Sequence, residues 1–126
     1  MNALVGDIGN TITKICIIQL KNFKIKKIFY FNSRIILSKH QLSENLRKII
    51  KNKPFSKAAL FSSVVPQYKS KLKNFLHKKY HIKLHEIKER NIKKIVKIKI
   101  KNKNQIGSDR IANAVGVYKK YKCNCI

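Results

Sequence analysis

The chain has 126 residues, a formal net charge of +25 and an apolar fraction of 44%, the size and composition of one ordinary globular domain. No apolar run approaches the roughly 18 residues that a membrane span needs, and the first residues do not resemble a signal peptide. The three cysteines are an odd number and argue against a disulfide framework. We therefore expect a cytoplasmic protein without a membrane segment.

The basic charge comes from 26 lysines and only 4 arginines, spread along the chain and interspersed with isoleucine and asparagine. Clustered basic residues are typical of nucleic-acid-binding proteins, which release counterions from phosphate backbones. Arginine is the preferred residue for reading phosphates and bases, so its scarcity argues against an evolved nucleic-acid surface. A general drift toward lysine, isoleucine and asparagine, with the charge on solvated faces, is the simpler interpretation.

The first half of the chain predicts three strands and a helix. Residues 2–8 read as a short buried strand, and residues 12–20 as a second strand rich in β-branched residues. The pair Gly9-Asn10 between them is typical turn chemistry, which predicts a β-hairpin. Residues 24–31 predict a third strand, and the apolar spacing within 38–51 predicts a helix.

The second half alternates between strands and helices. A buried strand is predicted over 57–66, ending at a proline, and a helix over 67–79. Strands over 82–86 and 92–100 follow, the second with strict alternation of apolar residues and lysine, which indicates one solvated face. A helix is predicted over 108–121. This order of elements predicts a single α/β domain over residues 1–126.

The last four residues, "CNCI" at 123–126, predict the beginning of a further strand, because they follow a helix and a short turn. We expect the domain to be truncated within that strand. The two cysteines lack the two-residue spacer of a redox motif or zinc knuckle, so they are interpreted as buried strand thiols.

The two aspartates and four glycines all fall in two short windows, 6–11 and 107–116. In the first window a strand ends at Asp7 and turns through Gly9-Asn10-Thr11, which presents backbone N–H groups and a hydroxyl to an anion. Asp7 could hold Mg²⁺ on a bound phosphate, since Mg²⁺ takes one or two carboxylates together with phosphate oxygens and water. A simple capped hairpin turn explains the same residues equally well.

In the second window Asp109 falls in the first turn of a predicted helix, with Ser108 as its N-cap. An acid at this place offsets the helix dipole and needs no further function. Alternatively, Asp109 is a general base, with Arg110 beside it to bind an anionic group of a substrate. A third cluster, His77, His81 and His85, has the spacing of one helical face, but strand character begins near His81, so it is a poor zinc site.

Together, "DIGNT" at 7–11, "SSVVP" at 62–66 and "GSDRIANAVGVYKKY" at 107–121 resemble the type III pantothenate kinases, over the whole chain. These kinases belong to the actin-like, sugar-kinase superfamily. The resemblance implies an actin-like (ribonuclease H-like) α/β fold with a mixed sheet and helices on its faces. It also implies transfer of the γ-phosphoryl group of ATP to the 4′-hydroxyl of pantothenate, the first step of coenzyme A synthesis.

The same resemblance implies roles for individual residues. The phosphate loop of the family corresponds to Asp7, Ile8, Gly9, Asn10, Thr11, Ile12, Thr13 and Lys14, with Asp7 near Mg²⁺. The pantothenate-binding element corresponds to Gly107, Ser108, Asp109 and Arg110, with Asp109 as the catalytic base. The two windows become two sides of one cleft, and phosphoryl transfer depends mainly on positioning and charge neutralisation there.

The sequence departs from the family pattern in two respects. Ile100 and the pair Asn102-Lys103 replace a tyrosine and an Asn-Pro that often contact pantothenate. Members of the family are also about twice as long, and the half absent here resembles a second actin-like domain with a second phosphate motif, the adenosine pocket and a K⁺ or NH₄⁺ site. We therefore expect this chain to be inactive alone unless a second polypeptide completes it. The resemblance also implies that the full-length protein is a homodimer.

Two other functions remain as alternatives. A small basic nucleic-acid-binding protein is predicted from charge, and would be indifferent to Asp109. A ribonuclease H-like nuclease would need three or four converging carboxylates for two metals. The five available acids are Asp7, Glu44, Glu86, Glu89 and Asp109, and the glutamates lie in ordinary surface patterns.

Overall fold

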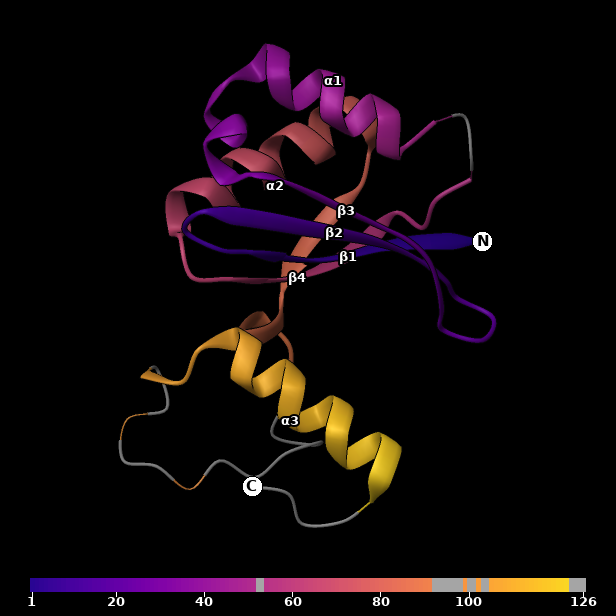
Figure 1. Ribbon diagram of the computed structural model, residues 1–126, viewed down its shortest axis with the longest axis vertical. Coiled ribbons are helices and arrows are strands. Elements are labelled where there is room, and N and C mark those ends of the chain that lie inside the picture. The colour runs from indigo at the N-terminus through magenta and orange to yellow at the C-terminus, as the bar shows by residue number, and fades with distance from the viewer. Residues whose placement is uncertain (52–53, 92–98, 100–101, 103–104, 123–126) are drawn as a thin grey trace.

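The computed structural model describes residues 1–51, 54–91, 99, 102 and 105–122. Within these residues, five strands form one mixed sheet in the order β3-β2-β1-β4-β5 (Figure 1). The predicted α/β class is confirmed. The strand predicted at 123–126 lies outside the described residues, as does the strand predicted over 92–100 apart from Lys99, which is not in a strand.

Strands β1 (Asn2–Ile8), β2 (Ile12–Gln19) and β3 (Lys24–Asn32) form an antiparallel meander. Strand β1 pairs with β2 along one edge and, in parallel, with β4 (Ala58–Ser63) along the other. Strand β4 in turn pairs in parallel with β5 (Lys83–Glu86). Strand β1 therefore lies at the centre of the sheet, and its C-terminal end, where the first sequence window begins, is flanked by β2 and β4.

The helices connect the parallel strands. A 3₁₀ turn η1 (Ser33–Leu37) and helix α1 (Lys39–Ile49) lead from β3 to β4, and helix α2 (Pro66–Tyr80) leads from β4 to β5. Strand β4 ends earlier than predicted because Pro66 already occupies the first turn of α2, where its missing N–H costs nothing. After β5 come the 3₁₀ turn η2 (Ile87–Glu89) and helix α3 (Ser108–Tyr121), whose predicted bounds are confirmed.

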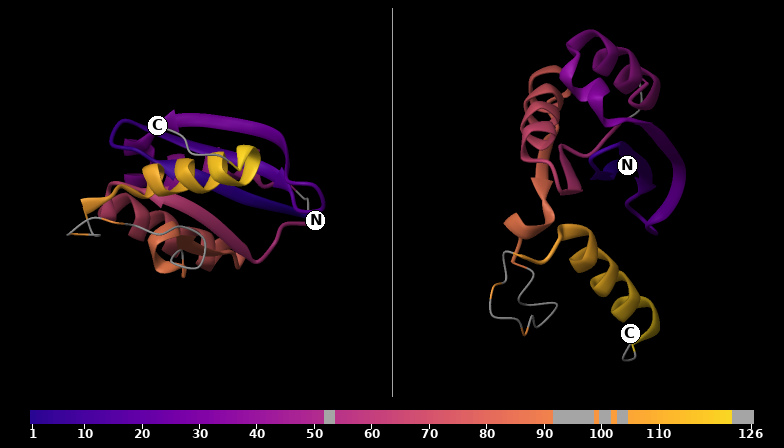
Figure 2. Two further views of the ribbon diagram at one scale, coloured as in Figure 1. Left: turned by 90° about the horizontal axis from the view of Figure 1, so that it is seen from below. Right: turned by 60° about the vertical axis from the view of Figure 1, so that its left-hand side comes forward.

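The hydrophobic core lies between one face of the sheet and the helices α1 and α2 (Figure 1). Its centre is made of side chains that are almost completely buried, among them Leu4, Ile15, Phe61, Leu46 and Leu76. Helix α3 lies on the opposite side of the sheet, where it contacts β4 and η2 (Figure 2). Only Ser108 and Ile111 of α3 are buried, so its first turn anchors it.

Two histidines of the spaced triplet, His81 and His85, lie on different elements. His81 caps the C-terminus of α2 in the left-handed conformation, with φ of 54°, and its N–H donates to carbonyl groups of the last turn. His85 lies on β5, so the triplet does not form one helical face. No group of three metal-ligating side chains occurs within the described residues. None of the described helices is long and apolar enough to cross a membrane.

Candidate functional site

On the face of the sheet opposite the core, the strand register decides which side chains lie next to one another. Asp7 on β1 is directly opposite Lys14 on β2 and Ser62 on β4. Because side chains alternate between the faces of a strand, Asp7 points away from the core while its neighbour Ile8 is fully buried in it. The sheet therefore presents a carboxylate, a lysine and a hydroxyl side by side.

Asp7 is held by a hydrogen bond from Ser62, whose hydroxyl donates to Oδ1 of the carboxylate. Ser62 is 4% exposed, whereas Asp7 is only half-buried. The hydroxyl therefore restrains one carboxylate oxygen, and the other has no protein partner among the described residues. Ser62 belongs to the "SSVVP" motif, but no sequence pattern predicts this contact, because the two residues meet only through the parallel pairing of β1 and β4.

The turn between β1 and β2 is fixed by polar contacts on its core side. Ser33 donates its hydroxyl to the carbonyl oxygen of Gly9 at 2.8 Å, and its own N–H donates to the carbonyl oxygen of Thr11 at 2.8 Å. The hydroxyl of Ser33 also bonds that of Thr13 at 2.8 Å. Both hydroxyl-bearing residues are fully buried. Thr13 thus stabilises the turn from its buried side, and its hydroxyl is not exposed to solvent.

The turn carbonyls point toward Ser33, and the N–H groups of Asn10 and Thr11 donate to no acceptor within the described part of the chain. Both residues are exposed. Successive unpaired N–H groups in a turn form an anion-binding concavity. The segment is thus a hairpin turn, as one interpretation of the sequence held, and it also leaves these donors free.

Gly9 is needed here for close backbone approach and not for a positive φ. A Cβ at this position would lie 2.7 Å from the carbonyl oxygen of Ile12, which accepts the Gly9 N–H at 3.1 Å. Any side chain would push the two sides of the turn apart.

Helix α3 presents Asp109 in its first turn. The N-cap is Gly107, in extended conformation, so the prediction of Ser108 as N-cap is wrong: Ser108 is the first helical residue and is 2% exposed. No side chain caps this helix end. Asp109 is exposed and stands in the positive field of the helix N-terminus, as does its neighbour Arg110.

The two aspartates line one cleft with a volume of about 650 Å³. Its walls come from the open face of the sheet, from Ile87 of η2, and from the first two turns of α3. The lining residues are Val5, Gly6, Asp7, Lys14, Cys16, Leu60, Ser62, Ile87, Asp109, Ala112 and Asn113. Windows that are about one hundred residues apart in the sequence therefore meet in space.

Other predicted residues lie outside this lining. Of the predicted phosphate loop only Asp7 and Lys14 line the cleft, and residues 8–13 do not; neither do Gly107 and Arg110. Ser108 lines a smaller neighbouring cavity of about 160 Å³ together with Ser63, Lys69 and Glu86. Ile100 and Lys103, two of the positions at which the sequence departs from the family pattern, lie outside the described residues. Cys16 and Asn113 also line the cleft, although the sequence analysis assigned a role to neither of them.

The cleft is lined by acidic and basic side chains and by one thiol. Burial raises the pKa of the Cys16 thiol above its ordinary value, and the charge of Lys14 opposes this effect. Cys16 is therefore a neutral thiol at neutral pH. Lys14 lies opposite Asp7 in the strand register, so a positive and a negative side chain flank the open end of β1. Such a pair suits a ligand that carries phosphate and a divalent cation.

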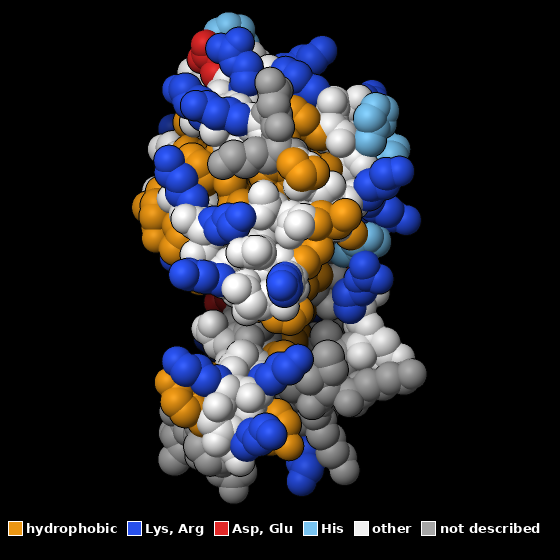
Figure 3. Space-filling view, turned by 90° about the vertical axis from the view of Figure 1, so that its right-hand side faces the viewer, with side chains coloured by type: hydrophobic (Ala, Val, Ile, Leu, Met, Phe, Trp, Pro, Cys, Tyr) orange, Lys and Arg blue, Asp and Glu red, His pale blue; other side chains and the backbone are white. Residues whose placement is uncertain are grey.

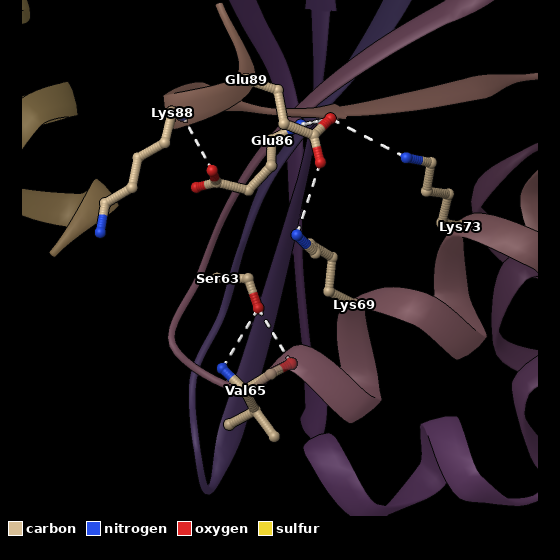
Figure 4. Close-up of polar contacts among 7 residues, drawn as sticks. All are labelled: Ser63, Val65, Lys69, Lys73, Glu86, Lys88 and Glu89. Atoms are coloured by element: carbon tan, nitrogen blue, oxygen red, sulfur yellow. Dashed lines mark hydrogen bonds and ion pairs between the residues drawn. The ribbon is translucent and has the colours of Figure 1, made fainter. Parts of the chain in front are cut away.

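Next to α3, the link from β5 to η2 is stabilised by a reciprocal cap (Figure 4). Glu86 accepts the N–H of Lys88 at 2.8 Å, and Glu89 accepts the N–H of Glu86 at 3.3 Å. Glu89 also pairs with Lys69 at 3.4 Å and Lys73 at 3.8 Å, both on α2. These contacts fix η2, and hence the wall of the cleft formed by Ile87, relative to α2.

Comparison with known proteins identifies the family. The family model of the type III pantothenate kinases matches residues 3–126. The chain belongs to the type III pantothenate kinase family. It is 47% identical over 117 residues to a type III pantothenate kinase of Pelagibacter ubique, strain HTCC1062. The match covers 90% of this chain and 45% of that relative, so the chain spans about half the length of the curated relative that it matches.

Proposed function

We propose that this chain supplies the Mg-ATP-binding side and the catalytic base of an enzyme that phosphorylates pantothenate on its 4′-hydroxyl, using ATP. The observation that carries the proposal is the single cleft that contains both Asp7 and Asp109. Family membership over residues 3–126 supports the reaction class. The alternative of a basic nucleic-acid-binding protein rested on charge alone, and the family match favours the kinase.

The first phosphate loop fits a nucleotide through its backbone. The free N–H groups of Asn10 and Thr11 would donate to phosphate oxygens, and Lys14 would neutralise their charge. Thr13 would act indirectly, because its buried hydroxyl holds Ser33, which in turn holds the carbonyl of Gly9. This arrangement keeps the loop rigid before any ligand arrives, which lowers the entropic cost of binding.

Asp7 fits a Mg²⁺ site of the kind that uses one protein carboxylate. Ser62 restrains one carboxylate oxygen, the other has no partner among the described residues, and Asp7 lines the cleft. Bound Mg²⁺ would complete its shell with phosphate oxygens and water, and would neutralise charge on the transferred group. Asp7 orients and binds in this scheme and takes no proton.

Asp109 would accept the proton of the pantothenate hydroxyl as that oxygen attacks the γ-phosphorus. It is exposed in the cleft and free of ion pairs within the described residues, so its carboxylate is available as a base. We also propose the pantothenate-binding role for Gly107, Ser108 and Arg110, which flank Asp109 at the start of α3, next to the cleft and not in its lining. The family also supports a K⁺ or NH₄⁺ ion bound by the other half, a homodimer, and a location in the cytoplasm, where ATP is supplied.

The test is an ADP-release assay with ATP and pantothenate. The chain is assayed alone and with the C-terminal half of the Pelagibacter relative supplied as a second polypeptide. We expect turnover only in the completed enzyme, and a loss of about 10²–10⁴-fold in Asp109→Asn, the range of a general base. A wild-type rate of turnover by the completed Asp109→Asn enzyme would contradict the role of Asp109 as the base. Turnover by the chain alone would contradict the need for a second half.

A further inference from the structure

A second concave site lies on the face of the sheet opposite the cleft, at the end where β1 begins. It has a volume of about 240 Å³ and is bounded by β3 and by the C-terminal end of α1. Four lysines stand around an apolar floor. We call it the lysine pocket; its lining is Asn2, Ile17, Lys26, Lys27, Phe29, Lys48, Ile49 and Lys51.

The lysines of this pocket have no acidic partner. All five acidic residues of the chain are described, and each is accounted for elsewhere. Glu44 lies near His40, Glu89 pairs with lysines of α2, Glu86 caps η2, and the two aspartates line the cleft. Four like charges around one depression repel one another, and a multivalent anion would relieve that repulsion.

The floor of the pocket is apolar and well ordered by packing. Ile17 and Ile49 are 6% and 3% exposed, and Phe29 is half-buried against the core. Lys27 places its ammonium group 5.0 Å from the centre of the Phe29 ring. Figure 3 looks at the end of the molecule where β1 begins, and shows basic side chains between exposed hydrophobic ones. The site therefore combines concentrated positive charge with an aromatic surface.

Two simpler reasons account for individual lysines. Strand β3 is an edge of the sheet, and lysines on an edge strand prevent pairing with other chains. Lys48 lies in the last turn of α1, where a cation offsets the helix dipole. Neither reason explains why lysines from both elements, with Lys51, converge on one depression that has an apolar floor.

We propose that the lysine pocket binds a small phosphorylated anion with at least two negative charges, such as a diphosphate or a phosphate ester. The volume suits a ligand of that size and not a nucleic-acid duplex. The sheet separates the pocket from the cleft, so binding here is independent of the proposed kinase site. A phosphate ester with an apolar group would place that group over Phe29.

The experiment is a titration of the ¹⁵N-labelled chain with inorganic pyrophosphate, without divalent metal, followed by amide NMR shifts. The test variant is Lys26→Gln with Lys48→Gln. Its matched control is Lys71→Gln with Lys78→Gln, which removes the same charge from exposed positions of α2. All four positions are exposed, and the dispersion of the amide spectrum reports whether each variant is folded.

We expect shifts at Phe29 and Ile49 that the test variant loses, whereas any shifts at Asn10 and Thr11, from the proposed phosphate loop, should remain in that variant. The test variant should bind pyrophosphate more weakly by about tenfold or more, from the loss of two close charges, and the control should bind nearly as the wild type does. Equal weakening in both variants, or shifts spread over the whole surface, would overturn the proposal and assign the binding to diffuse charge.

Discussion

Gly6 is the position where the packing of the sheet beside Asp7 can be tested most directly. An ideal Cβ at Gly6 would lie 2.2 Å from Cε1 of Phe61 and 2.6 Å from the carbonyl oxygen of Lys14. The ring of Phe61 is fully buried in the core, and the carbonyl belongs to the backbone of β2. Neither neighbour can move without disturbing the sheet.

We expect Gly6→Ala to destabilise the domain by about 1–3 kcal/mol, the range for added atoms in a well-packed core. For a domain of this size that corresponds to a fall in melting temperature of roughly 5–10 °C. The measurement is thermal unfolding followed by circular dichroism at one fixed ionic strength.

Gly116→Ala is the matched control. Gly116 lies within α3, and a Cβ there would meet nothing within 4 Å. Alanine is favoured over glycine inside a helix, so this change should stabilise α3 by about 0.5–1 kcal/mol. If Gly6→Ala melts at the wild-type temperature, the close approach of β1 to β2 and to Phe61 is not as the structure has it.

Three further predictions concern charge and the cleft. Cys16 should react slowly with iodoacetamide at neutral pH because burial raises its pKa, and Mg-ATP should slow it further; mass spectrometry of the Cys16 peptide measures both effects, and unchanged labelling with Mg-ATP would place the nucleotide elsewhere. Burial acts to raise the pKa of Glu89, but the Glu86 N–H and the charges of Lys73 and Lys69 outweigh it and lower that pKa. The stability that Glu89 contributes is therefore complete above its unfolded-state pKa of about 4.3, and it is lost as pH falls through the lower folded-state pKa. Wild type should be more stable to unfolding than Glu89→Gln by under about 1 kcal/mol near neutral pH, because the group is exposed, and this difference should vanish below the folded-state pKa. A difference in the free energy of unfolding that grows as pH falls would contradict this prediction. Because basic residues outnumber acidic ones by 30 to 5, the melting temperature should rise with NaCl concentration, and a flat response would show that self-repulsion is unimportant.

Most elements of the fold could be predicted because local patterns were strong. The β-branched runs around Gly9-Asn10 predicted the hairpin, and the apolar spacing predicted α3 with both of its end residues. The end of β4 was placed too late, because Val64 and Val65 have strand propensity while Pro66 already begins α2. There the requirement of the next helix outweighed local preference.

The candidate site was predicted in part. The rarity of aspartate and glycine drew attention to Asp7 and Asp109, and the structure brings both to one cleft. The bond from Ser62 and the buried support from Ser33 were not predictable, because both depend on pairing between segments far apart in the sequence. Ser108 was assigned as a cap from residue type, whereas packing buries it as the first residue of α3.

We propose that the Asp7 side of the cleft binds Mg-ATP independently of Asp109. The most direct test is calorimetric titration of the chain with Mg-ATP, comparing wild type, Asp7→Asn and Asp109→Asn. Loss of one charge-assisted contact of about 1.5–3 kcal/mol should weaken binding at least about tenfold in Asp7→Asn. Asp109→Asn should bind Mg-ATP nearly as the wild type does. Wild-type affinity in Asp7→Asn would contradict the assignment of the cleft.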